Sequence, residues 1–166
     1  MTNGTKVKKR DGRIESLDLD KMHLMVDEAC KGLAGVSASQ VEMKSGIQFY
    51  DGITTAEIQE ILIKSASDLI DLDHPNYQFV AARLLLFALR KQLFGRMHEF
   101  PSLSDHITKL AYDDVYDKDI FTKYSIEEIH KAEGFIDHDR DFLFTYAGLR
   151  QVVDKYLVQD RSSGEV

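Results

Sequence analysis

TKVKKRDGRIESLDLDKM, residues 5–22, is the stretch that decides how the fold begins. An Asp-Gly pair suits the positive backbone angles of a two-residue type I′ turn, so Asp11-Gly12 predicts a β-hairpin between residues 5–9 and 13–17. The first strand of this hairpin is rich in cations, although the whole chain has a formal net charge of −7. Acidic residues follow at once, at Glu15, Asp18 and Asp20. The stretch therefore predicts a turn that gathers both signs of charge in a small space.

Helical periodicity predicts four helices after the hairpin. Asp18 or Asp20 is expected to cap the first helix and Thr54 or Thr55 the third, because such side chains accept hydrogen bonds from the free N–H groups of a helix start. The fourth helix is apolar on most of its circumference, which is typical of a central, buried helix. The second is expected to turn Val41, Ile47 and Phe49 inward. The expected ranges are 18–33, 37–50, 54–70 and 75–95.

The rest of the chain predicts a helical connector. Phe100-Pro101 marks a junction, and shorter helices are expected at 103–112, 125–132 and 140–156. Residues 156–158 predict a strand, followed by a polar turn at 162–164 and the start of a returning strand. The expected fold class is mainly α: a small β-hairpin cap on a four-helix bundle at 5–95, then the connector at 96–166.

Composition places the chain among ordinary globular domains. A chain of 166 residues with a hydrophobic fraction of 43% can bury a core without a metal or a disulfide. The single cysteine, Cys30, excludes an internal disulfide and a four-cysteine zinc site, and it fits a reducing cytoplasm. No apolar run follows the N-terminal cations as in a signal peptide, and the most apolar segment, 79–94, is too short and too charged to span a membrane. The acidic balance argues against a protein that coats nucleic acid.

Cations in separate segments predict a site for one small anion. Lys9 and Arg10 enter the hairpin turn, and Lys21 lies in the first turn of the first helix. Thr55 is expected to cap the third helix, and Lys91 ends the fourth. Helix N-termini attract phosphate, so two of them with these cations would hold a triphosphate without a glycine-rich loop. The alternative is a solvated hairpin with surface charges that bind nothing.

The other polar groups are weaker indications of a binding or catalytic site. Glu15 and Asp18 are acceptors that would take the exocyclic amine of an adenine. The run 137–141, Asp-His-Asp-Arg-Asp, holds metal-ligand residue types, but an Asp before a helix is a usual cap. Cys30 is expected to be a small core residue rather than a nucleophile. The motifs of the P-loop and of the dinucleotide fold are both missing from the sequence.

Several stretches of the sequence resemble a known family. VKKRDGRIESLDLDKM looks like the start of an ATP-cone, the regulatory nucleotide-binding module of ribonucleotide reductases. DGITTAEIQEILIKSASDLI and PNYQFVAARLLLFALRKQLFG resemble its later helices in the large (alpha) chain of the aerobic, class I enzyme. IDHDRDFLFTYAGLRQVVDKYLVQDRSSGEV is similar to the segment that leads into the catalytic barrel of that enzyme. The long match after residue 95 points to the class I large chain of bacterial or phage type, because the KRDG motif alone would indicate only an ATP-cone.

The resemblance implies an allosteric site for ATP as activator and, in many family members, for dATP as inhibitor, together with Mg²⁺. Gln59 stands where related chains often have a histidine, and Asp18 where some have asparagine, so inhibition by dATP stays open. The phosphates would be held by Lys9, Arg10, Thr55, Lys91 and Lys21. The base and ribose would be lined by the run Glu15, Ser16, Leu17, Asp18, Leu19, Asp20 and Lys21.

The resemblance also implies partners. These are the remainder of the large chain, with its catalytic barrel, and the radical-bearing small (beta) subunit, in the cytoplasm of the cell or of the host of a phage; no nucleic acid or membrane is expected. Reduction needs several barrel cysteines, so no catalytic residue, redox cofactor or metal site is expected in a chain with one Cys. The predicted function is control of ribonucleoside-diphosphate reduction. A stand-alone nucleotide-sensing regulator and a pure interaction module are the alternatives.

Overall fold

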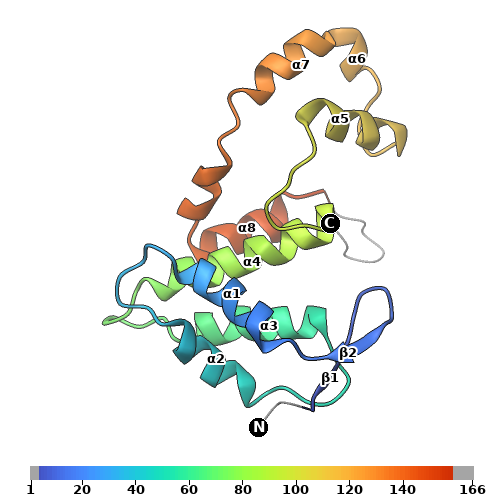
Figure 1. The fold of residues 1–166 in the computed structure, drawn as a ribbon. Coiled ribbons are helices and arrows are strands. Elements are labelled where there is room, and N and C mark those ends of the chain that lie inside the picture. Colours follow the sequence, from blue (N-terminus) through green and yellow to red (C-terminus); the bar gives the residue numbers. More distant parts are fainter. Residues whose placement is uncertain (1–3, 159–166) are drawn as a thin grey trace.

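The computed structural model describes residues 4–158 of the 166-residue chain. Within that range the fold is mainly α, with a small sheet at one end of the helices, which confirms the predicted fold class (Figure 1). The elements in chain order are β1 (Lys6–Lys8), β2 (Ile14–Ser16), α1 (Leu19–Cys30), α2 (Ala38–Gly46), β3 (Ile53–Thr54), α3 (Thr55–Ser67), α4 (Tyr77–Phe94), α5 (Leu103–Tyr112), α6 (Ile120–Lys123), α7 (Ile126–Glu133), the 3₁₀ helix η1 (His138–Leu143) and α8 (Tyr146–Lys155).

The sheet has the order β2–β1–β3. β1 pairs antiparallel with β2, with Val7 opposite Glu15, so the predicted hairpin is confirmed. β1 also pairs in parallel with β3, with Val7 opposite Ile53, and this strand was missed because two residues show no periodicity. Val7 and Ile53 are buried, which seats the sheet on the helices.

The hairpin turn differs from the predicted two-residue type I′ turn. The Gly12 N–H donates to the Lys9 carbonyl (3.0 Å) and the Lys9 N–H donates to the Arg13 carbonyl (2.8 Å), so the loop has three residues. Gly12 has φ +86°, whereas Asp11 lacks the positive φ that type I′ requires. The Asp11 carboxylate accepts from the Arg13 backbone N–H (3.1 Å) and from its guanidinium (2.7 Å). These bonds hold Asp11 in the ordinary turn conformation, so the predicted turn type was wrong.

Local signals place the helix starts well. Asp18 caps α1 by accepting from the Lys21 N–H (3.0 Å). Thr54 caps α3 in a capping box with Glu57, and α4 ends at Gly95 in the left-handed conformation, with φ +73°. The end of α2 was predicted less well, since the helix stops at Gly46 and leaves Ile47 86% exposed rather than inward.

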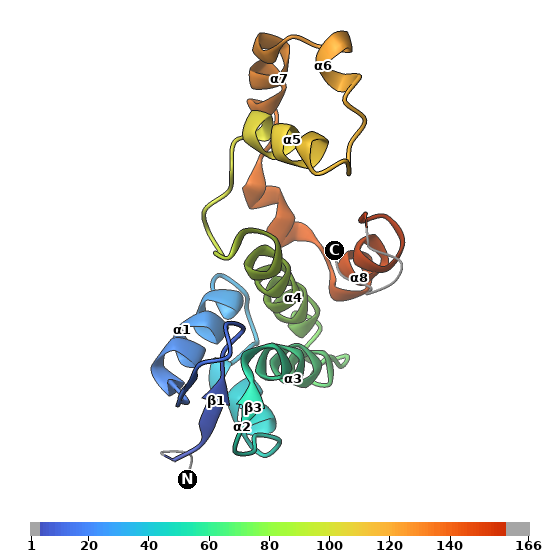
Figure 2. The same cartoon turned by 90° about the vertical axis from the view of Figure 1, so that its right-hand side faces the viewer.

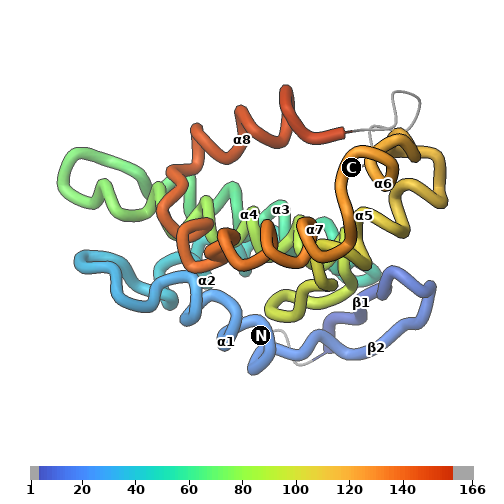
Figure 3. The backbone as a smooth tube through the Cα atoms, turned by 90° about the horizontal axis from the view of Figure 1, so that it is seen from above, coloured from blue at the N-terminus to red at the C-terminus, as the bar shows by residue number. Residues whose placement is uncertain are grey.

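The core forms around α4, the predicted central helix. Its fully buried side chains include Val80 and Phe87. α8 packs on α4 and adds Leu149 and Val153 to the same core. α8 lies on the side of α4 away from the β1–β2 hairpin (Figures 2 and 3). The division into 5–95 and 96–166 stays a prediction, and α8 is the element of the second part that shares the core of the first.

Helices α5, α6 and α7 project away from α1–α4 as an arm, here defined as residues 97–143 (Figures 1 and 2). α5 has the predicted bounds, and Ser125 forms the predicted capping box with Glu128 at the start of α7. The short α6 was not predicted. The arm leaves from the end of α4 and returns through η1 to α8.

Two predictions for the end of the chain were wrong. The expected helix at 140–156 is divided into η1 and α8, because Thr145 caps a new helix by accepting from the Gly148 N–H (3.2 Å). Residues 156–158 are not a strand, since the N–H groups of Tyr156 and Leu157 both donate to the Val152 carbonyl and close the end of α8. The predicted turn at 162–164 and the returning strand lie outside the described residues.

Candidate functional site

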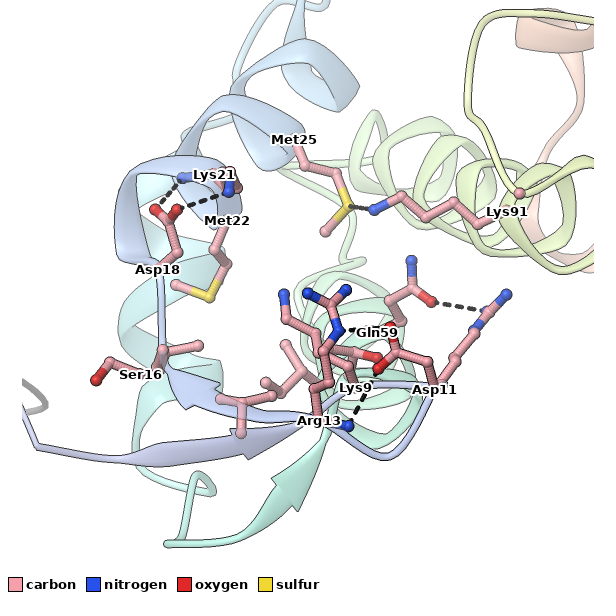
Figure 4. A pocket seen from close by; sticks show the side chains of 16 residues that line it. Lys9, Asp11, Arg13, Ser16, Asp18, Lys21, Met22, Met25, Gln59 and Lys91 are labelled. Atoms are coloured by element: carbon pink, nitrogen blue, oxygen red, sulfur yellow. Dashed lines mark hydrogen bonds and ion pairs between the residues drawn. The ribbon is translucent and has the colours of Figure 1, made fainter.

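A hollow of about 420 Å³ lies between the hairpin, the N-termini of α1 and α3, and the C-terminus of α4 (Figure 4). Its volume is within the range of small-molecule sites. Most of the predicted site residues meet here, from segments far apart in the chain. The lining residues are Val7, Lys9, Arg10, Asp11, Arg13, Ser16, Leu17, Asp18, Lys21, Met22, Met25, Thr55, Ile58, Gln59, Lys91 and Gly95.

Cations dominate the charge of this pocket. Lys91 reaches from α4 toward α1, and its Nζ lies 3.9 Å from the Met25 sulfur (Figure 4). Burial lowers the pKa of Lys91, and the nearby Arg10 and Lys9 lower it further. Removal from water and repulsion between like charges both disfavour the charged form of Lys91. An anion in the pocket would relieve both effects.

The hairpin cations are only partly neutralised. Lys9 Nζ lies 3.4 Å from the Glu15 carboxylate, and an Arg13 guanidinium nitrogen lies 3.3 Å from the same group. The Arg10 guanidinium donates to the Gln59 side-chain oxygen at 3.5 Å. Gln59 is 8% exposed, so a nearly buried side chain orients Arg10, whose own side chain is exposed.

The start of α1 forms the opposite wall. Asp18 accepts from the Lys21 backbone N–H and pairs with the Lys21 ammonium at 3.1 Å. The bond from the backbone is the largest cause that lowers the pKa of Asp18, followed by the bond from the Lys21 side chain. Both carboxylate oxygens are therefore engaged in capping and pairing, and a ligand amine would have to compete for them.

Thr55 lines the pocket, but it does not cap α3 as expected. Thr54 is the cap and accepts from the Glu57 N–H (3.1 Å), and Thr55 is the first helical residue. Glu57 in turn accepts from the Thr54 N–H (2.8 Å) and hydroxyl (2.7 Å), and also from the Tyr50 hydroxyl (2.9 Å). Bonds from the Thr54 side chain are the largest cause of the lowered pKa of Glu57. The choice between the two threonines required the backbone pairing of β3.

Three predicted site residues do not line this pocket. Glu15 faces Lys9 and Arg13 through its ion pairs, and Leu19 and Asp20 line a second hollow of about 440 Å³ between α1 and α2. Sequence reasoning also missed the apolar wall of the pocket, which consists of Met22, Met25 and Ile58. Their signal was present as core periodicity, because a helical stripe that packs the core can continue into the wall of a pocket.

Comparison with known proteins matches this region to a family. A family model described as the ATP cone domain matches residues 5–92, which is more than half of the chain. The chain belongs to the ATP-cone family. The matched segment contains the hairpin, α1 to α3, and α4 up to Gln92, and hence almost the whole pocket lining of this ATP-cone protein.

Relatives of this ATP-cone protein extend the match beyond the cone. It is 49% identical over 166 residues to ribonucleoside-diphosphate reductase 1 subunit alpha of Escherichia coli (strain K12). This match covers 100% of the present chain and 22% of the Escherichia coli protein. It is 41% identical over 160 residues to the reductase subunit alpha of Enterobacteria phage T4, covering 95% of this chain and 21% of the phage protein. The chain therefore spans about a fifth of the length of the curated relatives it matches.

Within residues 4–158, the other candidate groups from the sequence analysis form no second site. In residues 4–158 no three His, Cys, Asp or Glu side chains gather as a metal site would require. Asp137 caps η1 by accepting from the Asp139 N–H, as predicted. Burial raises the pKa of Cys30 to about 11, so its thiol stays neutral near pH 7. None of the helices in this range combines the length and apolar character that crossing a bilayer requires.

Proposed function

We propose that this ATP-cone is the N-terminal regulatory part of a ribonucleoside-diphosphate reductase large chain, and that it binds ATP or dATP as an allosteric effector. The observation that carries the proposal is the meeting of Lys9, Arg10, Lys21 and Lys91, from three separate segments, around one hollow of ligand size. The lowered pKa of Lys91 supports an anionic ligand, because that cation lacks a carboxylate partner among the described residues.

The proposed pose follows from the charges. The triphosphate would contact Lys9, Arg10 and Lys91. The adenosine would lie toward α1, against Met22 and the segment 16–18. Mg²⁺ would arrive on the triphosphate, because the nearby carboxylates are already paired with cations and the ion prefers phosphate oxygens and water. No catalytic residue is proposed in this chain.

The proposed partners are the rest of the reductase large chain and the radical-bearing small subunit, in the cytoplasm. Support comes from the match to reductase alpha subunits, which continues through residue 166 well past the cone. That continuation favours a reductase part over a stand-alone regulator. An interaction module with a vestigial pocket is the other alternative, and it would be favoured if neither ATP nor dATP raised the melting temperature.

Replacing Lys9 by alanine is expected to weaken ATP binding by about 1–2 kcal/mol, the scale of one hydrogen bond to a charged group. The effect is moderate because Lys9 is already shared with Glu15. Isothermal titration calorimetry with MgATP would measure it. Lys8→Ala is the matched control, since Lys8 is exposed and does not line the pocket. Equal affinities of Lys9→Ala and wild type would remove Lys9 from the proposed phosphate site.

ATP binding is expected to take up a proton at alkaline pH. The pKa of Lys91 is lowered in the free protein, and a bound triphosphate would raise it again. Affinity should therefore fall as the pH rises through the lowered pKa of Lys91. Calorimetry in two buffers of different ionisation enthalpy should find proton uptake that increases as the pH rises toward the lowered pKa of Lys91. Uptake that persists in Lys91→Met would contradict this assignment.

A further inference from the structure

The C-terminal end of α4 contacts both the pocket and the arm. Lys91 and Gly95 line the pocket, whereas the neighbouring Arg90 is 5% exposed. Arg90 points into the base of the arm, here defined as residues 97–100 and η1 (His138–Leu143). The Arg90 guanidinium donates to the Asp141 carboxylate at 2.8 Å and to the Met97 carbonyl at 3.5 Å. One buried side chain thus holds both the segment that leaves α4 and the segment that returns to it.

Aromatic rings complete this cluster. The Arg90 guanidinium lies 4.6 Å from the centre of the Phe100 ring and 5.4 Å from that of Phe142. Phe100 is stacked on His138, with ring centres 3.9 Å apart and an angle of 8° between the rings. Phe100 belongs to the outgoing segment, and Phe142 and His138 belong to η1. A buried guanidinium with one carboxylate partner depends strongly on that partner, because an unpaired buried charge is costly.

We propose that Arg90 is a positioning residue for the nucleotide pocket and couples that pocket to the arm. This inference rests on the proposed nucleotide site. Helix ends fray, since their last carbonyls lack intrahelical partners, and here the last turn must hold the Lys91 ammonium close to other cations. The Arg90 contacts to Met97 and Asp141 oppose that fraying and keep Lys91 within the pocket.

Coupling of this kind works in both directions. If anchoring of the arm base by Arg90 favours the nucleotide-binding form of α4, bound nucleotide must favour the anchored arm by the same factor. A nucleotide on Lys91 is therefore expected to order residues 97–100 and η1, which do not line the pocket.

The test removes the far end of the contact. Asp141→Asn keeps the size of the side chain and changes no residue that lines the pocket. It is expected to weaken MgATP binding about fivefold or more in calorimetry, the lower end of measured couplings, and Asp141→Glu should restore most of the affinity. The matched control is Asp154→Asn, which removes an exposed Asp–Arg pair on α8 (3.5 Å to Arg150) and should leave ATP affinity unchanged.

Hydrogen exchange supplies a readout that a purely structural role would not move. In the wild type, MgATP is expected to slow amide exchange at 97–100 and 138–143 as well as in the pocket. In Asp141→Asn the slowing should remain in the pocket and disappear from the arm base. Arg90→Lys, which keeps the charge but loses the two-pronged contact, gives the same comparison if Asp141→Asn folds poorly.

Separate outcomes identify which idea fails. Wild-type ATP affinity in folded Asp141→Asn and Arg90→Lys, or exchange at the arm base that ATP does not change in the wild type, would overturn the role of Arg90 while the nucleotide site stands. Absence of ATP and dATP binding to the wild type would overturn the proposed function, and the coupling with it.

Discussion

Lys91→Met is expected to weaken MgATP binding about 100-fold, or about 2.7 kcal/mol, without lowering the stability of the free protein. Lys91 is a half-buried cation of the pocket, so its bond to phosphate would be poorly screened by water. Its pKa is lowered in the folded chain, which means that folding disfavours its charge. Methionine removes that penalty and can pack beside Met25, the present neighbour of the ammonium.

The opposite signs of these two effects make the prediction specific. Calorimetry measures the affinity, and thermal unfolding without nucleotide measures the stability. Lys64→Met is the matched control, because Lys64 is an exposed lysine of α3 paired with Asp68 and does not line the pocket. It should change neither quantity much. A Lys91→Met protein that binds ATP normally would remove α4 from the proposed site.

The pH dependence of stability should report the same group. Below the lowered pKa of Lys91 the folded protein carries the full cost of its charge, and the cost disappears above the ordinary lysine pKa of the unfolded chain. The contribution of Lys91 to the free energy of unfolding therefore rises with pH in that alkaline window. Lys91→Met should lack this rise when the two proteins are compared.

Leu149→Ala is expected to lower the free energy of unfolding by about 2–5 kcal/mol, the usual cost of emptying a leucine site in a core. Leu149 is 5% exposed and belongs to α8, which is outside the matched residues 5–92 yet packs on α4. A large effect would indicate that the cone and α8 unfold together. Chemical denaturation followed by circular dichroism measures it.

Leu143→Ala is the control for this change, because Leu143 is 71% exposed and the same atoms are removed from water-facing surface. Its effect should stay within about 0.5 kcal/mol. If both variants lowered the free energy of unfolding by an equally small amount, α8 would be a loosely attached element. The predicted division at residue 95 would then describe the folding units well.

The pocket shows how much of a binding site can be predicted from short-range sequence signals. The sequence groups Lys9, Arg10, Lys21 and Lys91, because helix starts and nearby cations attract phosphate, and the structure brings all four to one hollow. The resemblance to the ATP-cone gave the same group. Glu15 is predicted to accept from the adenine amine, and in the structure its carboxylate pairs with two hairpin cations.

Short-range sequence patterns are sufficient to predict the local parts of this protein. The Ser125 capping box and the glycine end of α4 depend on residues within one turn of each other, so they can be predicted directly, and the cap of α1 is narrowed to Asp18 or Asp20. The hairpin and the apolar central helix are also short-range patterns. These features determine which helices form and on which elements the cations lie.

How those parts combine depends on contacts between segments that are distant in the chain. β3 exists because β1 offers it free backbone groups, and Thr54 rather than Thr55 caps α3 because β3 extends to that residue. The arm is anchored and α8 joins the core through contacts between segments far apart in the chain, such as Arg90 with Asp141. Such contacts depend on how whole elements pack, and no periodicity in the local sequence records them.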